Sequence, residues 1–494
     1  MSRSPEKRLP EGPAVNASSA RTGSMVTYGA MVIGAVALFL LIDAYGGTLA
    51  APEPAVAGPE GSAPAAGHPD ALIHLLLALA AVLVTGRLLG LLFRYVGQPP
   101  VIGEVLGGIL LGPSLLGRIA PEAAGYLFPP SVAPSLGIVA QLGVILYMFL
   151  VGLEWNPGLL RQRAHATVAI SHASILAPFL LGAALALLLY PQLSNRDVPF
   201  TSFALFLGVA MSITAFPVLA RILTDWRMQK TRLGVIALAC AATDDVTAWC
   251  LLALVVGVAQ AKMGGALLTI GLAVAYLGFM LLVVQPLAAR LLSGFDEARL
   301  TPGIVALVFA ALLMSALATE FIGVHAIFGA FLLGAVIPHD SAIARTLTWK
   351  LKDLVTVLLL PAFFALTGMR TQIALVSGAE EWVLCGLIVL VATAGKFGGT
   401  LLSARVTGLD WRDSASLGIL MNTRGLMELI VLNIGLDLKV ISPTLFAMMV
   451  LMALVTTMAA TPILQLLTAA SPRSEPAGRA WPMPWRKASQ TLGY

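Results

Sequence analysis

Long apolar runs separated by short polar connections follow one another along nearly the whole of this sequence. A helix rises about 1.5 Å per residue, so about 20 apolar residues cross the hydrocarbon core of a bilayer. Of the 494 residues, 58% are hydrophobic and 11% are charged, whereas soluble domains carry about 25% charged residues. Because lipid cannot satisfy an open backbone, such runs cross the membrane as helices. We therefore predict an all-α polytopic membrane protein.

The apolar runs give the positions of the expected helices. An extra N-terminal transmembrane helix is predicted at residues 25–49. The later helices are predicted at residues 71–93, 101–117, 135–154, 164–190, 200–223, 231–260, 267–292, 303–322, 324–337, 351–372, 381–407, 413–436 and 443–467.

The Lys and Arg residues between these helices indicate the sides of the membrane. If the N-terminus is cytoplasmic and every predicted helix crosses, most loop cations fall on the cytoplasmic side. The opposite side then keeps Arg118, Arg196, Lys262, Arg370 and Lys439. Cytoplasmic loops carry an excess of Lys and Arg, so we predict a multi-pass protein of the cell membrane with both termini cytoplasmic. The net charge of +5 follows this asymmetry and does not indicate nucleic acid as a partner.

The same reading divides the chain into segments. A cytoplasmic tail is expected at 1–24, followed by the extra helix at 25–49 and a flexible loop rich in Ala, Pro and Gly at 50–70. A transmembrane transport domain is expected at 71–467, and a short cytoplasmic tail at 468–494.

The transport domain itself divides into two halves. Six predicted helices occupy 71–260 and six occupy 303–467, with a linker helix at 267–292 between them. Six crossings return the chain to its starting side, and the linker carries it across once more. The second half therefore begins on the opposite side, which predicts an inverted-topology repeat.

The fifth helix of each half is interrupted at a corresponding position. The first interruption contains Thr214 and Pro217, and the second contains Asn422, Thr423 and Arg424. Proline removes a backbone donor, and Asn and Thr weaken helix continuity. Paired broken helices expose backbone dipoles near the membrane midplane, where transporters bind ions. Two ordinary kinks are the alternative interpretation.

Two adjacent acids, Asp244 and Asp245, are the only charged residues between Gly234 and Gln260. One carboxylate at that depth costs at least a few kcal/mol, and two neighbouring carboxylates also repel each other. Adjacent helical residues point about 100° apart, so one acid can face an ion cavity while the other faces a neighbouring helix. We predict that the pair binds cations and protons.

Three further ionisable residues lie within predicted helices. Lys396 needs a buried carboxylate as its partner, and an Asp–Lys pair suits exchange because an arriving cation can displace the ammonium. Arg424 and Glu428 are spaced i, i+4 and can pair with each other. The spacing leaves two interpretations open for that pair, a structural brace or a part of the ion path.

Oxygen-bearing side chains at similar depth could add to the site. Hard cations take several oxygen ligands, which makes Thr243, Thr214 and Thr423 candidate ligands. A threonine in a transmembrane helix can instead bond back to its own backbone. Glu104 follows a predicted cytoplasmic loop, where it either gates access or caps its helix.

Several motifs of this chain resemble those of one known family, the monovalent cation:proton antiporter-2 family with its sodium/hydrogen-exchanger-like domain. These motifs are most similar to those of the plant cation/H+ exchanger branch and its bacterial relatives. The matching segments are GQPPVIGE (97–104), GGILLGP (107–113), FLVGLE (149–154), SITAFPVLA (212–220), TDD (243–245), HAIFGAF (325–331) and NTRGLMEL (422–429).

The resemblance implies an alternating-access antiporter with two crossed broken helices, usually a homodimer, in the lipid bilayer. It implies that Asp245 binds the monovalent cation or the proton and that Asp244 pairs with Lys396. Two aspartates with a lysine also resemble the electrogenic subgroup. Neither the resemblance nor the spacing chooses between Na+ and K+. No cofactor is expected beyond the transported Na+ or K+ and H+.

Three other functions compete with this interpretation. A channel-like potassium efflux protein is the first alternative, although a fixed ion pair in an open pore would block conduction. An intramembrane aspartyl protease needs two carboxylates from separate helices, whereas Asp244 and Asp245 are adjacent, so we do not expect an enzyme. The third alternative is an organic anion symporter of the bile-acid type, which would also contain an inverted repeat, but buried acids suit a cation better.

Overall fold

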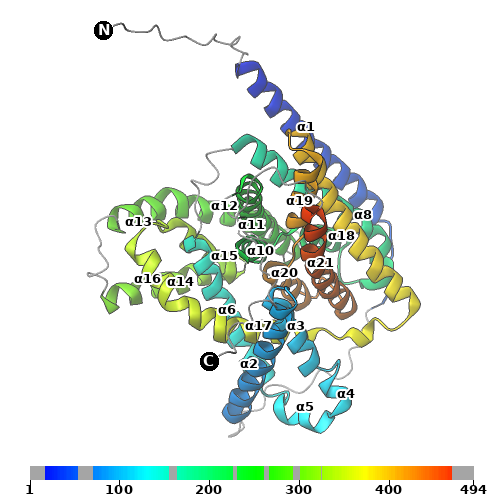
Figure 1. The fold of residues 1–494 in the computed structure, drawn as a ribbon, viewed down its shortest axis with the longest axis vertical. Helices are drawn as coiled ribbons and strands as arrows, with labels where there is room; N and C mark the ends of the chain where they lie inside the picture. The colour runs from blue at the N-terminus through cyan, green and yellow to red at the C-terminus, as the bar shows by residue number, and fades with distance from the viewer. Residues whose placement is uncertain are drawn as a thin grey trace, which may run out of the picture.

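The computed structural model describes residues 17–53, 71–154, 164–225, 228, 231–260, 266–292, 301–323 and 325–469. Within these residues every regular element is a helix (Figure 1). The elements are α1 (Ala17–Gly46), α2 (Ala71–Tyr95), α3 (Pro100–Leu111), α4 (Leu116–Ile119), α5 (Pro121–Leu127), α6 (Ala133–Glu154), α8 (Ala164–Leu193), α9 (Phe200–Ser212), α10 (Phe216–Asp225), α11 (Arg232–Gln260), α12 (Ala266–Phe279), η1 (Met280–Val284), α13 (Gln285–Leu292), α14 (Pro302–Ile322), α15 (Ala326–Val336), α16 (Ala342–Asp353), η3 (Leu354–Leu359), α17 (Leu360–Arg370), η4 (Ile373–Leu375), α18 (Ala379–Val406), α19 (Trp411–Met421), α20 (Leu426–Asp437) and α21 (Pro443–Ala469).

Eleven helices of the described residues are long and apolar enough to cross a membrane, which confirms the polytopic prediction. Three other predicted segments take different forms. Two of them are broken into the pairs α9–α10 and α19–α20, and the third is the 11-residue helix α15. Residues 1–16 of the predicted N-terminal tail, 54–70 of the predicted loop and 470–494 of the predicted C-terminal tail lie outside the described residues.

Two helix starts differ clearly from the prediction. Helix α1 begins at Ala17, inside the predicted tail at 1–24, instead of at residue 25. The helix expected at 351–372 begins at Ala342, because α16 continues through η3 into α17. Its first turns carry Arg345, Lys350 and Lys352, which lower the local hydropathy and hide the helix from an apolar window.

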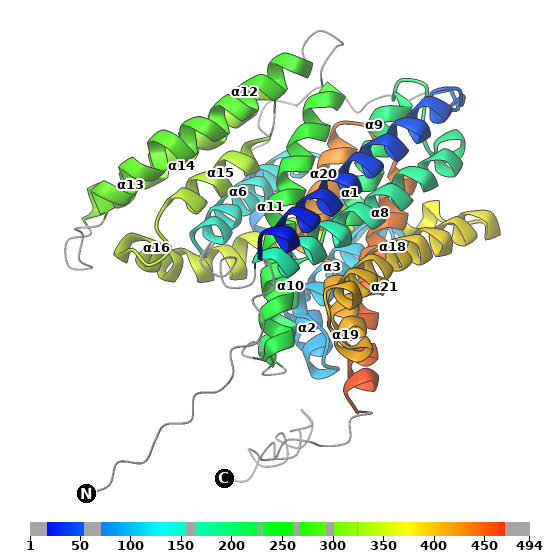
Figure 2. The same cartoon turned by 90° about the horizontal axis from the view of Figure 1, so that it is seen from above.

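Most of the helices pack into two groups. We call α2, α3, α6, α14, α15, α16 and α17 bundle A, and α8, α9, α10, α11, α18, α19, α20 and α21 bundle B. Figure 1 shows α6, α14 and α15 on one side of the molecule and α8, α18 and α21 on the other. Seen from above in Figure 2, the linker elements α12 and α13 lie on the far side of the molecule from α8 and α18.

Glycines bring the helices within each bundle into backbone contact. In bundle A, a Cβ on Gly108 of α3 would lie 2.4 Å from the carbonyl oxygen of Ala365 in α17. In bundle B, a Cβ on Gly395 of α18 would lie 2.7 Å from Cα of Pro178 in α8. Small residues permit this close approach in membrane helices, so each bundle is internally tight.

We expect Gly108→Ala to destabilise the protein by about 1–3 kcal/mol, because the added methyl meets backbone atoms that cannot turn aside. The matched control is Gly137→Ala in α6, where a Cβ would meet nothing within 4 Å. That substitution should leave stability equal or raise it by about 0.5–1 kcal/mol, since alanine is the better helix former. Thermal unfolding in detergent measures both, and a Gly108→Ala variant that melts with the parent would contradict the tight packing.

The extra N-terminal helix α1 packs on bundle B. Asp43 accepts a hydrogen bond of 2.7 Å from the hydroxyl of Thr201, at the start of α9. The rings of Phe39 and Phe179 lie 5.6 Å apart, which joins α1 to α8. Both views show α1 running along this group of helices (Figures 1 and 2).

Candidate functional site

Helix α11 carries the two adjacent acids into the interior of bundle B. The Asp244 side chain is fully buried, and Asp245 is 3% exposed. Helices α8, α9 and α19 pack against α11, so the acids lie where the two broken helices meet.

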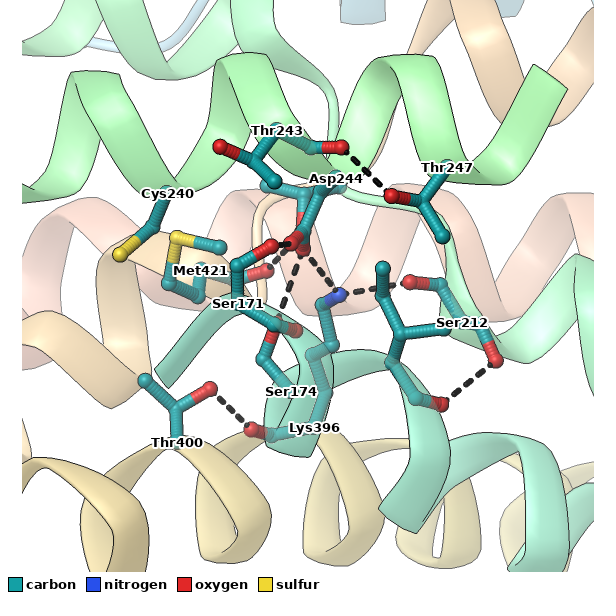
Figure 3. Close-up of polar contacts among 12 residues, drawn as sticks. Ser171, Ser174, Ser212, Cys240, Thr243, Asp244, Thr247, Lys396, Thr400 and Met421 are labelled. Carbon is teal, nitrogen blue, oxygen red and sulfur yellow. Dashed lines mark hydrogen bonds and ion pairs between the residues drawn. The ribbon is translucent and has the colours of Figure 1, made fainter. Parts of the chain in front are cut away.

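Hydrogen-bond donors from α8, from α18 and from the break between α9 and α10 surround Asp244 (Figure 3). Ser171 donates to Oδ1 at 2.5 Å, and Ser174 donates to Oδ2 at 2.9 Å. Thr214 and Lys396 also donate to Oδ2, at 2.9 Å and 2.8 Å. Four donors neutralise and hold this buried carboxylate, so it has little capacity left for another ligand.

Lys396 reaches the site from α18, with its side chain fully buried. Besides the ion pair with Asp244, its ammonium donates to the carbonyl oxygen of Ser212 at 2.6 Å. Ser212 is the last residue of α9, where helix carbonyls lose their partners and carry partial negative charge. The ammonium therefore balances both a carboxylate and a helix end.

Asp245 has a much less saturated environment. The backbone N–H of Phe216, the first residue of α10, donates to its carboxylate. Its Oδ1 atom is buried and has no hydrogen-bond partner among the described residues. A buried carboxylate oxygen without a donor is costly, which makes this atom available to a cation or a proton.

The two helix breaks contact each other directly. The backbone N–H of Ala215 in the first break donates to the carbonyl oxygen of Thr423 in the second at 3.0 Å. The Thr214 hydroxyl has one hydrogen, which it can donate either to Asp244 or to the carbonyl oxygen of Met421, 3.0 Å away. In the second break, the Asn422 side-chain oxygen is buried and has no partner within the described residues.

Arg424 lies in the second break and holds the end of α9. Its guanidinium donates to the carbonyl oxygens of Ala210 at 3.0 Å and Met211 at 2.8 Å. It also lies 3.4 Å from Oε2 of Glu428, as the i, i+4 spacing predicts. The arginine thus ties the second broken helix to the first through backbone carbonyls, which is the geometry of a brace.

Comparison with known proteins identifies the fold that carries this site. Residues 78–470 match the family described as "Sodium/hydrogen exchanger, transmembrane". The chain belongs to this family.

Curated relatives of the family include a Na(+)/H(+) antiporter, NhaS4, of Synechocystis, which is 43% identical over 79% of this chain and 96% of its own length. Cation/H(+) antiporter 20 of Arabidopsis thaliana is 41% identical over 78% of this chain. K(+)/H(+) antiporter 1 of Saccharomyces cerevisiae is 34% identical over 78% of this chain. The chain spans about half the length of the plant and yeast relatives, 48% and 45%.

A solved structure shares the fold. The sodium proton antiporter MjNhaP1 of Methanocaldococcus jannaschii superposes with a TM-score of 0.61, at 15% identity. The match covers 81% of this chain and 99% of the other.

Four predicted site residues lie away from the acids, bond to their own helix or lie within a regular helical turn. Glu104 lies in bundle A, where a Cβ on Gly86 of α2 would be 3.6 Å from its side chain. Thr243 donates back to the carbonyl oxygen of Ala239, and Thr423 to that of Leu420. Pro217 lies in the first turn of α10, where its missing N–H is not needed.

Two serines of the site, Ser171 and Ser174, were not anticipated from the sequence, nor was the contact of Lys396 with the backbone carbonyl of Ser212. Ser171 and Ser174 are spaced i, i+3 on α8, so one helix face carries both hydroxyls. That spacing was the available signal. Among the described residues no group of three His, Cys, Asp or Glu side chains could hold a metal ion.

Proposed function

We propose that this protein is a secondary active transporter that exchanges Na+ or K+ for protons across a membrane by alternating access. The observation that carries the proposal is the contrast between the two acids, one saturated with donors and one with an open oxygen. The names of the relatives, which are Na+/H+, K+/H+ and cation/H+ antiporters, support the same reaction class.

In this proposal Asp245 binds the transported cation and the proton in turn. Its open Oδ1 faces no competing donor among the described residues, so either species can occupy it. Asp244 is the counter-charge of Lys396, since its two oxygens accept four hydrogen bonds. A cation at Asp245 repels the nearby ammonium, which couples cation binding to the charge state of Lys396 and supports electrogenic exchange.

Further oxygen ligands would come from the two breaks. Asn422 has a buried side-chain oxygen without a described partner, and Thr214 lies between Asp244 and the second break. Hard cations require several such oxygens. Arg424 and Glu428 would act as a brace that keeps the breaks in contact. Thr243 would serve at most as an additional ligand, and Glu104 at most as an access gate.

The proposal extends to the arrangement in the membrane. We place both termini in the cytoplasm of a cell-membrane protein, with repeat one at 71–260, linker helix 267–292 and repeat two at 303–467. Arg370 then lies at the outer end of its helix. A homodimer is also proposed. In the span Gly271–Arg290 only 6% of the residues of an 18-residue stretch are buried, which leaves an apolar face for lipid or a second copy.

Proton flux in proteoliposomes tests the function. An imposed gradient of Li+, Na+, K+ or Rb+ should move protons in the opposite direction, and the cation that does so at the lowest concentration is the substrate. Protein-free liposomes are the control. Cation movement that leaves an imposed pH gradient intact would instead support the second candidate, a channel-like potassium efflux protein.

A further inference from the structure

Bundle A meets bundle B where α17 faces α20. Helix α17 is fixed in bundle A, because a Cβ on Gly368 would lie 2.4 Å from the carbonyl oxygen of Val105 in α3. Helix α20 is fixed in bundle B, because a Cβ on Gly435 would lie 2.1 Å from the Phe206 ring in α9. Any movement of one bundle against the other must therefore change the contacts between α17 and α20.

Side chains, not glycine contacts, join these two helices. The Asn433 amide donates to the hydroxyl of Thr367 at 2.8 Å, and both side chains are buried. Arg370 donates to the side-chain oxygen of Asn433 at 3.1 Å and to Asp437 at 2.9 Å. We call Thr367, Arg370, Asn433 and Asp437 the α17–α20 latch.

At the opposite end of the interface between bundles A and B, the described contact is weaker. Gln98, in the turn between α2 and α3, donates to the carbonyl oxygen of Met458 in α21 at 3.1 Å. Gln98 precedes α3, whereas Gly112 after α3 approaches Met369 beside the latch, so the two contacts lie at opposite ends of α3. A neutral bond is weaker than a charge-assisted network. The difference favours the state in which the Arg370 end is closed.

The latch also borders a cavity. A space of about 970 Å³ is lined by Leu366, Met369, Arg370 and Asp437, together with residues of α5 and α6. Arg370 and Asp437 are 34% and 51% exposed, so the charged half of the latch can be hydrated when it opens. A latch that separates without stranding a buried charge can open and close repeatedly.

We infer that the α17–α20 latch breaks and re-forms in each exchange cycle and sets the ratio of the two access states. This inference rests on the alternating access proposed above. Arg370, Asn433 and Asp437 act as positioning residues, since they hold α20 and touch neither acid of the site. Weakening the latch raises the fraction of molecules that are open at the Arg370 end. The apparent affinity for the cation at that end rises with this fraction.

The test uses vesicles of both orientations and measures KM for the driving cation at each end. Arg370→Gln and Asp437→Asn should each lower KM at the Arg370 end by about three- to tenfold, the worth of one or two hydrogen bonds. KM at the opposite end should not fall. The matched control is Arg118→Gln, an exposed cation after α3 that is outside the latch and should change neither KM.

The double variant Arg370→Asp with Asp437→Arg should return KM toward the wild-type value. Equal KM values in wild type, Arg370→Gln and Asp437→Asn would overturn the latch, as would an equal shift at both ends. Hydrogen exchange of α17 and α20 gives a readout without transport, and Arg370→Gln should accelerate it while Arg118→Gln should not. Absent flux in wild type together with accelerated exchange would reject the proposed function and keep the latch.

Discussion

Asp245→Asn should reduce cation-dependent proton flux to the level of protein-free liposomes. An amide has no negative charge and cannot take up a proton at physiological pH, so both substrates lose their site. Removing a full charge from a buried cation site costs several kcal/mol, which corresponds to more than about a hundredfold in affinity. Flux in proteoliposomes and cation binding by calorimetry measure the two losses.

The fold should survive this substitution, which keeps the result interpretable. Asparagine retains an oxygen that can accept the backbone N–H of Phe216. The other carboxylate oxygen has no described partner to lose. Thr247→Val is the matched control on the same helix. Within the described residues that hydroxyl bonds back to the carbonyl oxygen of Thr243 at 2.9 Å and to nothing else, so its loss should preserve flux. If Asp245→Asn transports as the wild type does, the assignment of Asp245 as the cation- and proton-binding residue is wrong.

The positions of the helices and of their breaks could be read from the sequence because each has a local cause. Hydropathy marks a membrane span, and it works for α8 and α18 because their mean hydropathy is high, 2.2 for Thr167–Leu193 and 1.7 for Ala379–Val406. The breaks at 213–215 and 422–425 contain Thr, Asn and Gly, and Pro217 lies just after the first break, in the first turn of α10. The effects of these residues on a helix are also local. The polar start at α16 shows the limit of that method.

The partners of the buried charges depend on tertiary structure and were only partly readable. Lys396 had few candidate carboxylates in apolar surroundings, so charge balance directed it to the aspartates. Arg424 was matched with Glu428 by spacing, yet its shortest contacts are the carbonyl oxygens of Ala210 and Met211. Every residue has such an oxygen, so sequence gives no sign of which ones a helix break will free.

The different roles of the two acids could not be derived from the 100° offset alone. That offset separates the directions of Asp244 and Asp245 without saying which one meets Lys396. The decision depends on α8, whose Ser171 and Ser174 face Asp244, and on the first residue of α10, which faces Asp245. Helix α8 belongs to an earlier part of the chain, and neither its contact nor that of α10 can be read from the spacing of the two acids, so the assignment in the sequence came from family resemblance alone.

Lys396→Gln should make exchange less sensitive to membrane potential. In the proposed cycle the charge state of the Lys396 side chain changes when the cation binds, and glutamine has no charge to change. Asp244 keeps three hydroxyl donors but loses its counter-charge, so the variant should also unfold more easily, by about 3–5 kcal/mol for a broken buried pair. Adding Asp244→Asn removes the orphaned charge and should recover most of that stability without restoring the response to potential. Proton flux driven by Na+ at two clamped potentials, with thermal unfolding of the same preparations, separates the two effects. If Lys396→Gln responds to potential as wild type does, the lysine takes no part in the charge that the cycle moves, and its role reduces to holding Asp244 and the end of α9.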